Sequence, residues 1–171
     1  MSANIQGNAV RLADEDALAL ELASLGYPGL SHLRPGGERK NPAEVLLSAL
    51  SARELDSRLI EALPWVLLNY PDMNWAWLIN AAKAHDLQNR LGFVTSVARR
   101  LAEMGGEFDK ATLLGRWEAE LEQSRLERED TLCHDSLTGP ERRWLRERRS
   151  EDAKRWGLMA DLSPEHLPYA A

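Results

Sequence analysis

The segment of residues 63–102 constrains the fold of this 171-residue chain more than any other part of the sequence. It contains three of the six tryptophans and two apolar stripes, separated by a polar stretch over residues 85–90. The clearer stripe consists of Leu87, Leu91, Val94, Ala98 and Leu101. Apolar residues at spacings of four and three form one face of an amphipathic helix. Because such faces need partners to cover them, the segment predicts a packed helical core.

Signals that begin and end helices recur along the rest of the chain. Asp14 is expected to cap a first helix that ends at Gly26, and Asn41 followed by Pro42 is expected to open the next one. No segment alternates polar and apolar residues for long enough to predict a strand. The sequence therefore predicts an all-α protein, an antiparallel helical array or bundle in which helix pairs can stack as in HEAT-like proteins.

Three positions decide how the central helices are divided. Ser51 followed by Glu54 has the pattern of a capping box and predicts a helix over residues 52–63. Pro64 cannot continue that helix without losing a hydrogen bond, so we expect a break there and a short helix after it. Asp86 is expected to open the helix that carries the clearer stripe.

The pair Gly105-Gly106 divides the chain into two regions of different composition. Residues 1–106 are predicted to form a helical core, and residues 107–171 a charged helical C-terminal region that packs on it as one domain. In the second region, a long charged helix is expected over residues 109–130. The next helix, over residues 140–156, is opened by a capping-box pattern at Thr138 and Glu141, and it either is unbroken or restarts at Ser150.

Composition limits the classes of function. The formal net charge of −6 and the pI near 5.3 disfavour non-specific binding to nucleic acid, which depends on neutralising phosphates. Cys133 is the only cysteine, which excludes an intramolecular disulfide and a zinc site built from cysteines. We find no secretion signal and no apolar run near the ~20 residues that a membrane helix needs, so a cytoplasmic protein without membrane association is expected.

Short catalytic motifs are missing from the sequence. It has no Walker loop, dinucleotide glycine fingerprint, nucleophile elbow or HExxH pattern. Cys133-His134-Asp135 lacks further ligands at metal-binding spacing. We therefore predict no cofactor, no metal and no catalytic residue, although enzymes without short motifs exist.

A basic helix interleaved with tryptophan is the first candidate site. Its predicted partner-binding residues are Arg142, Trp144, Arg146, Arg149 and Trp156. The three arginines share one helix face, which suits an acidic partner surface or phosphates. Acidic residues within 140–156 disfavour binding to phosphates and favour a protein partner. The alternative is a solvated helix in which glutamate and arginine pair with each other.

The polar stretch before the clearer stripe is the second candidate site. A small pocket there would be lined by His85, Gln88, Asn89 and Trp77. The alternative is structural: where two helices meet, free backbone groups need partners, and the amide side chains then bind loop carbonyls. In this alternative Asp86 and Arg90 form a surface pair, four residues apart on one helix.

The sequence of residues 63–102, above all His85-Asp86-Leu87-Gln88-Asn89-Arg90-Leu91-Gly92-Phe93, resembles a segment of bacterial proteins encoded beside toxins or DNA-binding regulators. Some of those proteins are antitoxins. The resemblance implies a helical protein that binds a partner and sequesters a toxin, and it assigns no site residues. A helix-turn-helix often accompanies such a segment, but none is visible in this sequence, which disfavours autonomous DNA binding.

These observations predict a non-catalytic bacterial interaction protein, antitoxin-like, that covers its partner's working surface with the helix over residues 140–156. The first alternative is a nucleic-acid-associated regulator that uses the same helix. The second is a small-molecule-binding or enzymatic helical domain with its site at His85, Gln88 and Asn89. A homodimer formed through the helix over residues 109–130 is a further hypothesis.

Overall fold

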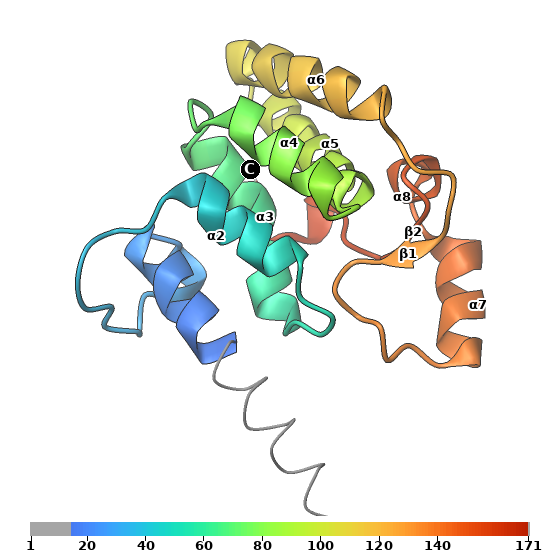
Figure 1. The fold of residues 1–171 in the computed structure, drawn as a ribbon, viewed down its shortest axis with the longest axis horizontal. Helices are drawn as coiled ribbons and strands as arrows, with labels where there is room; N and C mark the ends of the chain where they lie inside the picture. Colours follow the sequence, from blue (N-terminus) through green and yellow to red (C-terminus); the bar gives the residue numbers. More distant parts are fainter. Residues whose placement is uncertain (1–14, 171) are drawn as a thin grey trace, which may run out of the picture.

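The computed structural model describes residues 15–170 and is mainly helical (Figure 1). In chain order, the elements are a first helix over residues 15–24, η1 (Pro28–Leu30), α2 (Pro42–Leu50), α3 (Ser57–Asn69), α4 (Trp75–Ala84), α5 (Gln88–Met104), α6 (Phe108–Glu122), β1 (Asp130–Thr131), α7 (Gly139–Arg148), α8 (Glu151–Arg155), β2 (Leu158–Met159) and η2 (Pro164–His166). The predicted helical array is confirmed, with a two-stranded parallel sheet and an isolated bridge between Glu54 and His134 added to it within the described residues. The predicted cap Asp14 lies outside them.

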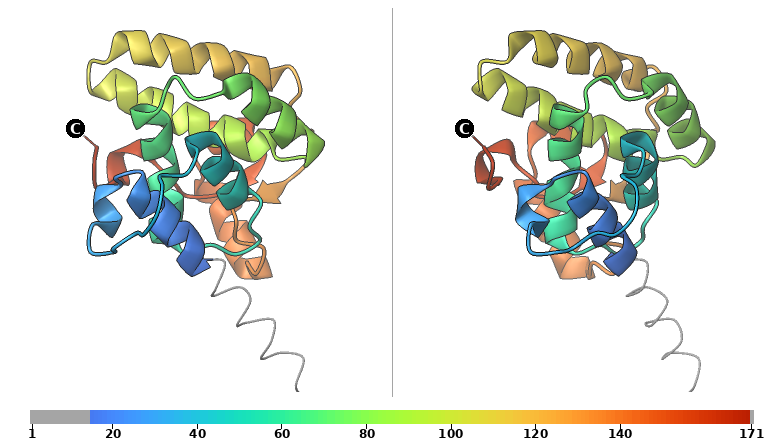
Figure 2. Two further views of the ribbon diagram at one scale, coloured as in Figure 1. Left: turned by 60° about the vertical axis from the view of Figure 1, so that its left-hand side comes forward. Right: turned by 90° about the vertical axis from the view of Figure 1, so that its left-hand side faces the viewer.

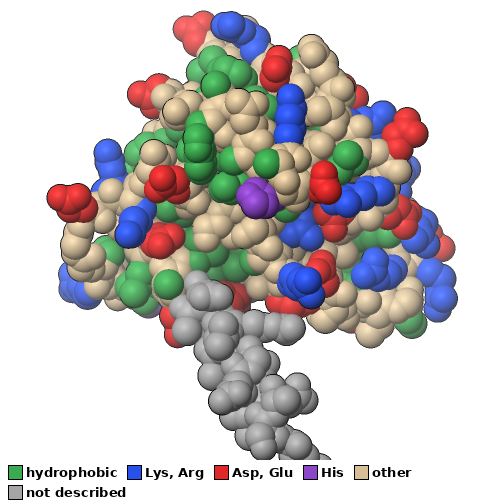
Figure 3. Space-filling view, in the orientation of Figure 1, with side chains coloured by type: hydrophobic (Ala, Val, Ile, Leu, Met, Phe, Trp, Pro, Cys, Tyr) green, Lys and Arg blue, Asp and Glu red, His purple; other side chains and the backbone are tan. Residues whose placement is uncertain are grey.

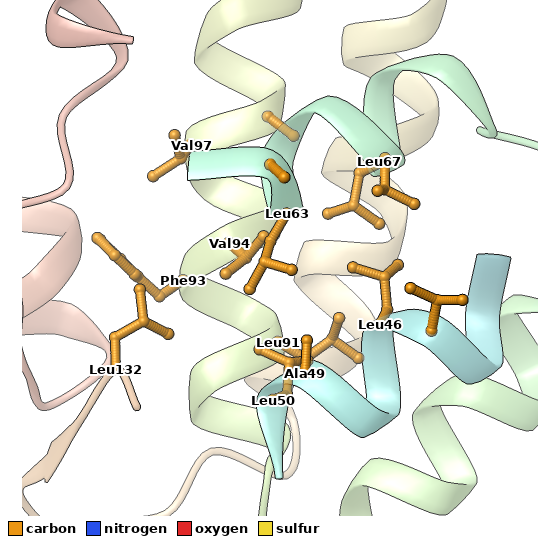
Figure 4. Close-up of a cluster of buried hydrophobic side chains, with 14 of the residues drawn as sticks. Leu46, Ala49, Leu50, Leu63, Leu67, Leu91, Phe93, Val94, Val97 and Leu132 are labelled. Atoms are coloured by element: carbon orange, nitrogen blue, oxygen red, sulfur yellow. The ribbon is translucent and has the colours of Figure 1, made fainter. Parts of the chain in front are cut away.

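Helix α5 lies at the centre of the molecule. All five residues of its predicted stripe are buried, and α3 packs on it through Leu63 while α6 lies antiparallel along it (Figures 2 and 4). The helix is also buried beyond that stripe, because every residue from Gln88 to Ala98 is shielded from solvent. Residues 91–98 carry no charged side chain, which is the composition of a helix covered on all sides.

The predicted break at Pro64 is wrong. Helix α3 runs through Pro64, which is itself buried, and its N-cap is Asp56, whose carboxylate accepts a hydrogen bond from the Arg58 amide. Ser51 ends α2 instead of opening a helix, and the Glu54 carboxylate accepts from the Ser136 amide. A proline inside a helix costs about 3 kcal/mol, and burial of the apolar face of α3 offsets that cost.

The predicted role of Asp86 is also wrong. Asp86 has φ 56° and ends α4, while α5 begins two residues later at Gln88. The Leu87 amide donates to the Ala82 carbonyl at 2.8 Å, and the Asp86 amide donates to the Lys83 carbonyl. This is the Schellman arrangement, which requires a left-handed residue at the position that Asp86 occupies.

The C-terminal region winds back over the core. Helix α6 ends at Glu122 rather than near residue 130, and the following segment reaches β1, which pairs with β2 in the register Asp130↔Leu158. Of the two alternatives for residues 140–156, the restart at Ser150 is the one observed, because its hydroxyl accepts from the Ala153 amide and caps α8. Among the described residues, no helix combines the length and apolar character needed to cross a membrane.

Candidate partner-binding surface

Helix α7 stands at one edge of the molecule, away from the central helix α5 (Figure 1). Its start is set by the predicted capping box: the Thr138 hydroxyl accepts from the Glu141 amide, and the Glu141 carboxylate accepts from the Thr138 amide. Leu145 is its one buried residue. The helix therefore rests on the protein through a narrow inner side and exposes most of its circumference.

The three predicted arginines all bind groups of this chain, and the Arg146 side chain among them stays 47% exposed. Arg142 donates to the Leu137 carbonyl at 3.3 Å, and Arg149 donates to the Leu158 carbonyl at 3.2 Å. Arg146 forms a two-pronged pair with Glu129, at 3.1 and 2.8 Å. That hydrogen bond and the positive charge of Arg146 hold the pKa of Glu129 below its usual range. The arginines therefore fix α7 to the loop before it and to β2.

The expectation that Trp156 anchors a partner is wrong. Its side chain is completely buried, and its indole Nε1 donates to the Ser96 hydroxyl at 3.0 Å. The ring lies against Gly92 of α5, where an added Cβ would be 2.4 Å from two of its carbons. Trp156 is thus part of the core and joins α8 to α5.

Trp144 lies on the opposite, outer side of α7 and is 49% exposed. The Arg148 guanidinium lies 5.3 Å from the centre of its ring, within the range of a cation–π contact. Arg143 and Glu147 are also exposed on this helix. We call Arg143, Trp144, Glu147 and Arg148 the Trp144 face. Neither of its arginines forms an ion pair within residues 15–170.

The charges around α7 have both signs. In Figure 3, basic and acidic side chains lie intermixed along the right-hand edge, where α7 and α8 are found in Figure 1. Glu141, Glu147 and Glu151 are exposed there beside the arginines. Because the positive charges are interrupted, this edge is suited to specific pairing with another protein more than to a continuous phosphate backbone.

The candidate pocket around the polar stretch is not assembled. Gln88 and Asn89 are buried, and their amide groups donate to the Ser124 and Leu126 carbonyls at 3.0 and 2.8 Å. The Asn89 oxygen also accepts from the Leu126 amide at 2.9 Å. His85 is exposed at the end of α4, and Trp77 is 40% exposed. The alternative expectation, that the amides bind loop carbonyls, is confirmed.

The expected surface pair between Asp86 and Arg90 is wrong, because Arg90 is buried. Its guanidinium binds the Asp130 carboxylate at 2.9 and 3.1 Å and donates to the Leu50 and Ala52 carbonyls at 2.8 and 3.0 Å. Burial alone would raise the pKa of Asp130, but the hydrogen bond and charge of Arg90 outweigh it and hold that pKa below its ordinary value. Arg90 therefore ties α2 and β1 to α5.

Cys133 lies in the same buried cluster and shows no sign of a nucleophile. Burial raises the pKa of its thiol to about 11, although the neighbouring Arg90 charge acts in the other direction. A thiol with a raised pKa is mostly protonated and unreactive at neutral pH. Within residues 15–170, no three His, Cys, Asp or Glu side chains come together to hold a metal ion.

The sequence-based interpretation missed how strongly the C-terminal region is bound to the core. Glu129 and Asp130 carry no local signal for their arginine partners, which lie 17 and 40 residues away. The uncharged run over residues 91–98 is the one sequence signal that indicates a fully covered α5, and it does not identify the partners of Arg90.

Comparison of the chain with protein-family models, curated proteins and solved structures gave no match. Fold and site together define a mainly helical array with a peripheral charged helix that exposes one tryptophan. The resemblance of residues 63–102 to toxin-associated proteins stays a sequence-based expectation.

Proposed function

We propose that this chain is a non-catalytic bacterial interaction protein, antitoxin-like, that binds a partner protein through the Trp144 face. The observation that best supports this proposal is the half-exposed Trp144 on the outer side of α7. Tryptophan and arginine are the residue types most enriched among those that dominate interface energies. The Trp144 face offers one tryptophan with Arg143 and Arg148 beside it.

The attachment of α7 to the rest of the chain supports this proposal. Its capping box orders its first turn, and the buried Leu145 and the hydrogen bond from Arg149 to the Leu158 carbonyl join its other end to the core. A surface that is ordered before binding loses less conformational entropy when the partner arrives. The partner's matching surface is expected to combine an apolar hollow for Trp144 with acidic side chains for the two free arginines.

Nucleic-acid binding by the same helix is the weaker alternative. Arg142, Arg146 and Arg149 already bind groups of this chain, which leaves Arg143 and Arg148 for phosphates. Proteins that bind nucleic acid through its backbone usually make several such contacts, and the chain carries a net charge of −6. A steep loss of affinity with added salt would favour this alternative over the protein partner.

The test uses the protein encoded beside this chain's gene, co-expressed and purified with it. Trp144→Ala is expected to weaken binding by about 2 kcal/mol or more, roughly 25-fold, as for a central interface tryptophan. Trp77→Ala is the matched control, because Trp77 is a similarly exposed tryptophan on another helix. Calorimetry or surface plasmon resonance measures both affinities.

The charge arm of the test is the double variant Arg143→Glu/Arg148→Glu, which should slow association and lower affinity. Circular dichroism confirms that each variant keeps its helical content. The proposal is wrong if no complex forms, or if Trp144→Ala and Trp77→Ala bind the neighbouring protein as tightly as the unmodified chain.

A further inference from the structure

A cavity of about 330 Å³ lies on the inner side of α7, between α3, β2 and the segment that contains η2. It is separate from the Trp144 face, because the residue that α7 contributes to it is the buried Leu145. Binding sites for small molecules occupy roughly 300–1,000 Å³. The cavity is therefore large enough for a small ligand.

The cavity walls combine apolar side chains that belong to the folded core with polar ones, of which Asp161, His134 and His166 are exposed. Leu132, Leu145, Met159 and Leu167 line it and are buried, and they come from four different segments of the C-terminal region. The Tyr169 hydroxyl donates to the carbonyl of Glu61, a lining residue, and links α3 to the segment after η2. The cavity thus exists before any ligand binds, with an apolar surface that favours an aliphatic chain.

The charged groups that line the cavity have one sign. Glu61 and Asp161 line it, whereas no lysine or arginine does. Neither carboxylate forms an ion pair within residues 15–170. His134 and His166 also line the cavity, but together with these carboxylates they make no set of metal ligands among the described residues.

We infer that this cavity binds a small organic cation with an aliphatic body, of the class of primary alkylamines. The ammonium group would donate charge-assisted hydrogen bonds to Glu61 and Asp161, the free carboxylates of the lining. The aliphatic chain would lie against Leu145, Met159 and Leu167 and leave water. An anion of the same shape would meet two like charges, and a neutral alcohol would lack the ion pair.

The test is a titration of the unmodified protein with n-pentylamine, pentanol and pentanoate, followed by isothermal calorimetry and by chemical shifts of backbone amides. Pentylamine is expected to bind with millimolar affinity or better and to shift amides around the cavity. Its affinity should exceed that of pentanol by about tenfold or more, the size of a charge-assisted hydrogen bond. Pentanoate should not bind.

Variants locate the site. Glu61→Gln/Asp161→Asn should weaken pentylamine by about tenfold or more. The matched control is Glu44→Gln/Asp109→Asn, which removes the same charge from two exposed carboxylates that do not line the cavity. Ala160→Leu, which adds volume to the cavity wall, should also reduce binding.

The inference is overturned if pentylamine does not bind, or if pentanol and pentanoate bind as well as it does. It is also overturned if the control variant loses as much affinity as Glu61→Gln/Asp161→Asn, since the amine would then respond to net charge alone. The comparison of the three ligands on the unmodified protein decides the matter even where a variant fails to fold.

Discussion

Replacing Arg90 by methionine tests the central claim about how the C-terminal region is held. Arg90→Met keeps an apolar stem of similar length and removes the guanidinium. In the native protein that group is paired with Asp130, and the side chains of the pair are 8% and 19% exposed. It also donates to the carbonyls of Leu50 and Ala52.

The magnitude follows from what the substitution leaves behind. Removing one member of a buried ion pair costs about 3–5 kcal/mol, because the other charge stays without its partner. The Leu50 carbonyl, in a buried residue, loses its side-chain donor and adds about 1 kcal/mol. We therefore expect Arg90→Met to lower the free energy of unfolding by about 4–6 kcal/mol, a large part of the ~5–15 kcal/mol of a typical domain.

Urea denaturation followed by far-ultraviolet circular dichroism measures this free energy. The matched control is Arg146→Met, because Arg146 binds Glu129 with the same two-pronged geometry at an exposed site. Exposed pairs contribute little, so this variant should unfold almost as the native protein does. The reasoning is refuted if Arg90→Met loses less than about 1 kcal/mol, or no more than Arg146→Met.

The pH dependence gives the same prediction a second readout. A carboxyl whose native pKa is lowered, as that of Asp130 is, stabilises the fold above its unfolded pKa of about 3.9. This contribution disappears as the pH falls through the lower native value. Stability should therefore fall as the pH drops below about 4, and Arg90→Met should lack this part of the decline.

Two further predictions concern the core around α5. Cys133 should react with iodoacetamide at pH 8 only as fast as the protein opens, because it is buried and burial raises the pKa of its thiol to about 11. Mass spectrometry at increasing urea concentrations measures the labelled fraction. Rapid labelling without urea would contradict the prediction. Gly92→Ala should lower the free energy of unfolding by about 1–3 kcal/mol, because the new Cβ meets the Trp156 ring. Gly115→Ala is the control, because the nearest atom to a Cβ there is the flexible Arg99 Cδ at 3.4 Å and alanine favours a helix. Equal urea midpoints for the two variants would count against the packing of Gly92 on Trp156.

Features with a local cause were predictable from the sequence. The caps at Asn41, Thr138 and Ser150 bind amides two or three residues away, and each of them opens the helix that its pattern predicts. The stripe of α5 likewise needs only the helix period and a core to face. Such local patterns predict the observed structure correctly where tertiary packing favours the same conformation.

Some local signals, among them Pro64 and Asp86, were overruled by packing or by a neighbouring turn. Pro64 predicts a break in the helix, but α3 continues through it because its apolar face, Pro64 included, is buried in the core. Asp86 looks like a helix start, but the end of α4 needs a left-handed residue at that position. In each case the same residue type fits two structures. Tertiary packing selects one for Pro64, and the hydrogen bonds that close the turn after α4 select one for Asp86.

The candidate partner-binding surface was predicted only in part. Trp144 is exposed on a capped helix, whereas Trp156, twelve residues further on, donates to Ser96 from inside the core. The basic pattern of residues 140–156 does not determine which of its side chains point toward the core and which point toward solvent. Whether an arginine there is free depends on Glu129, Leu137 and Leu158, whose positions are set by the path of the chain.

By itself the sequence determined the helical class, the helix starts at Asn41, Thr138 and Ser150, and the apolar face of α5, because these follow from interactions between residues a few positions apart. Only the tertiary structure decided that Arg90 is buried, that Trp156 is in the core and that Trp144 remains outside. The hydrogen bonds responsible span 40 residues for Arg90 and 60 for Trp156. Contacts of that range depend on how whole helices pack, and no pattern of neighbouring residues encodes them.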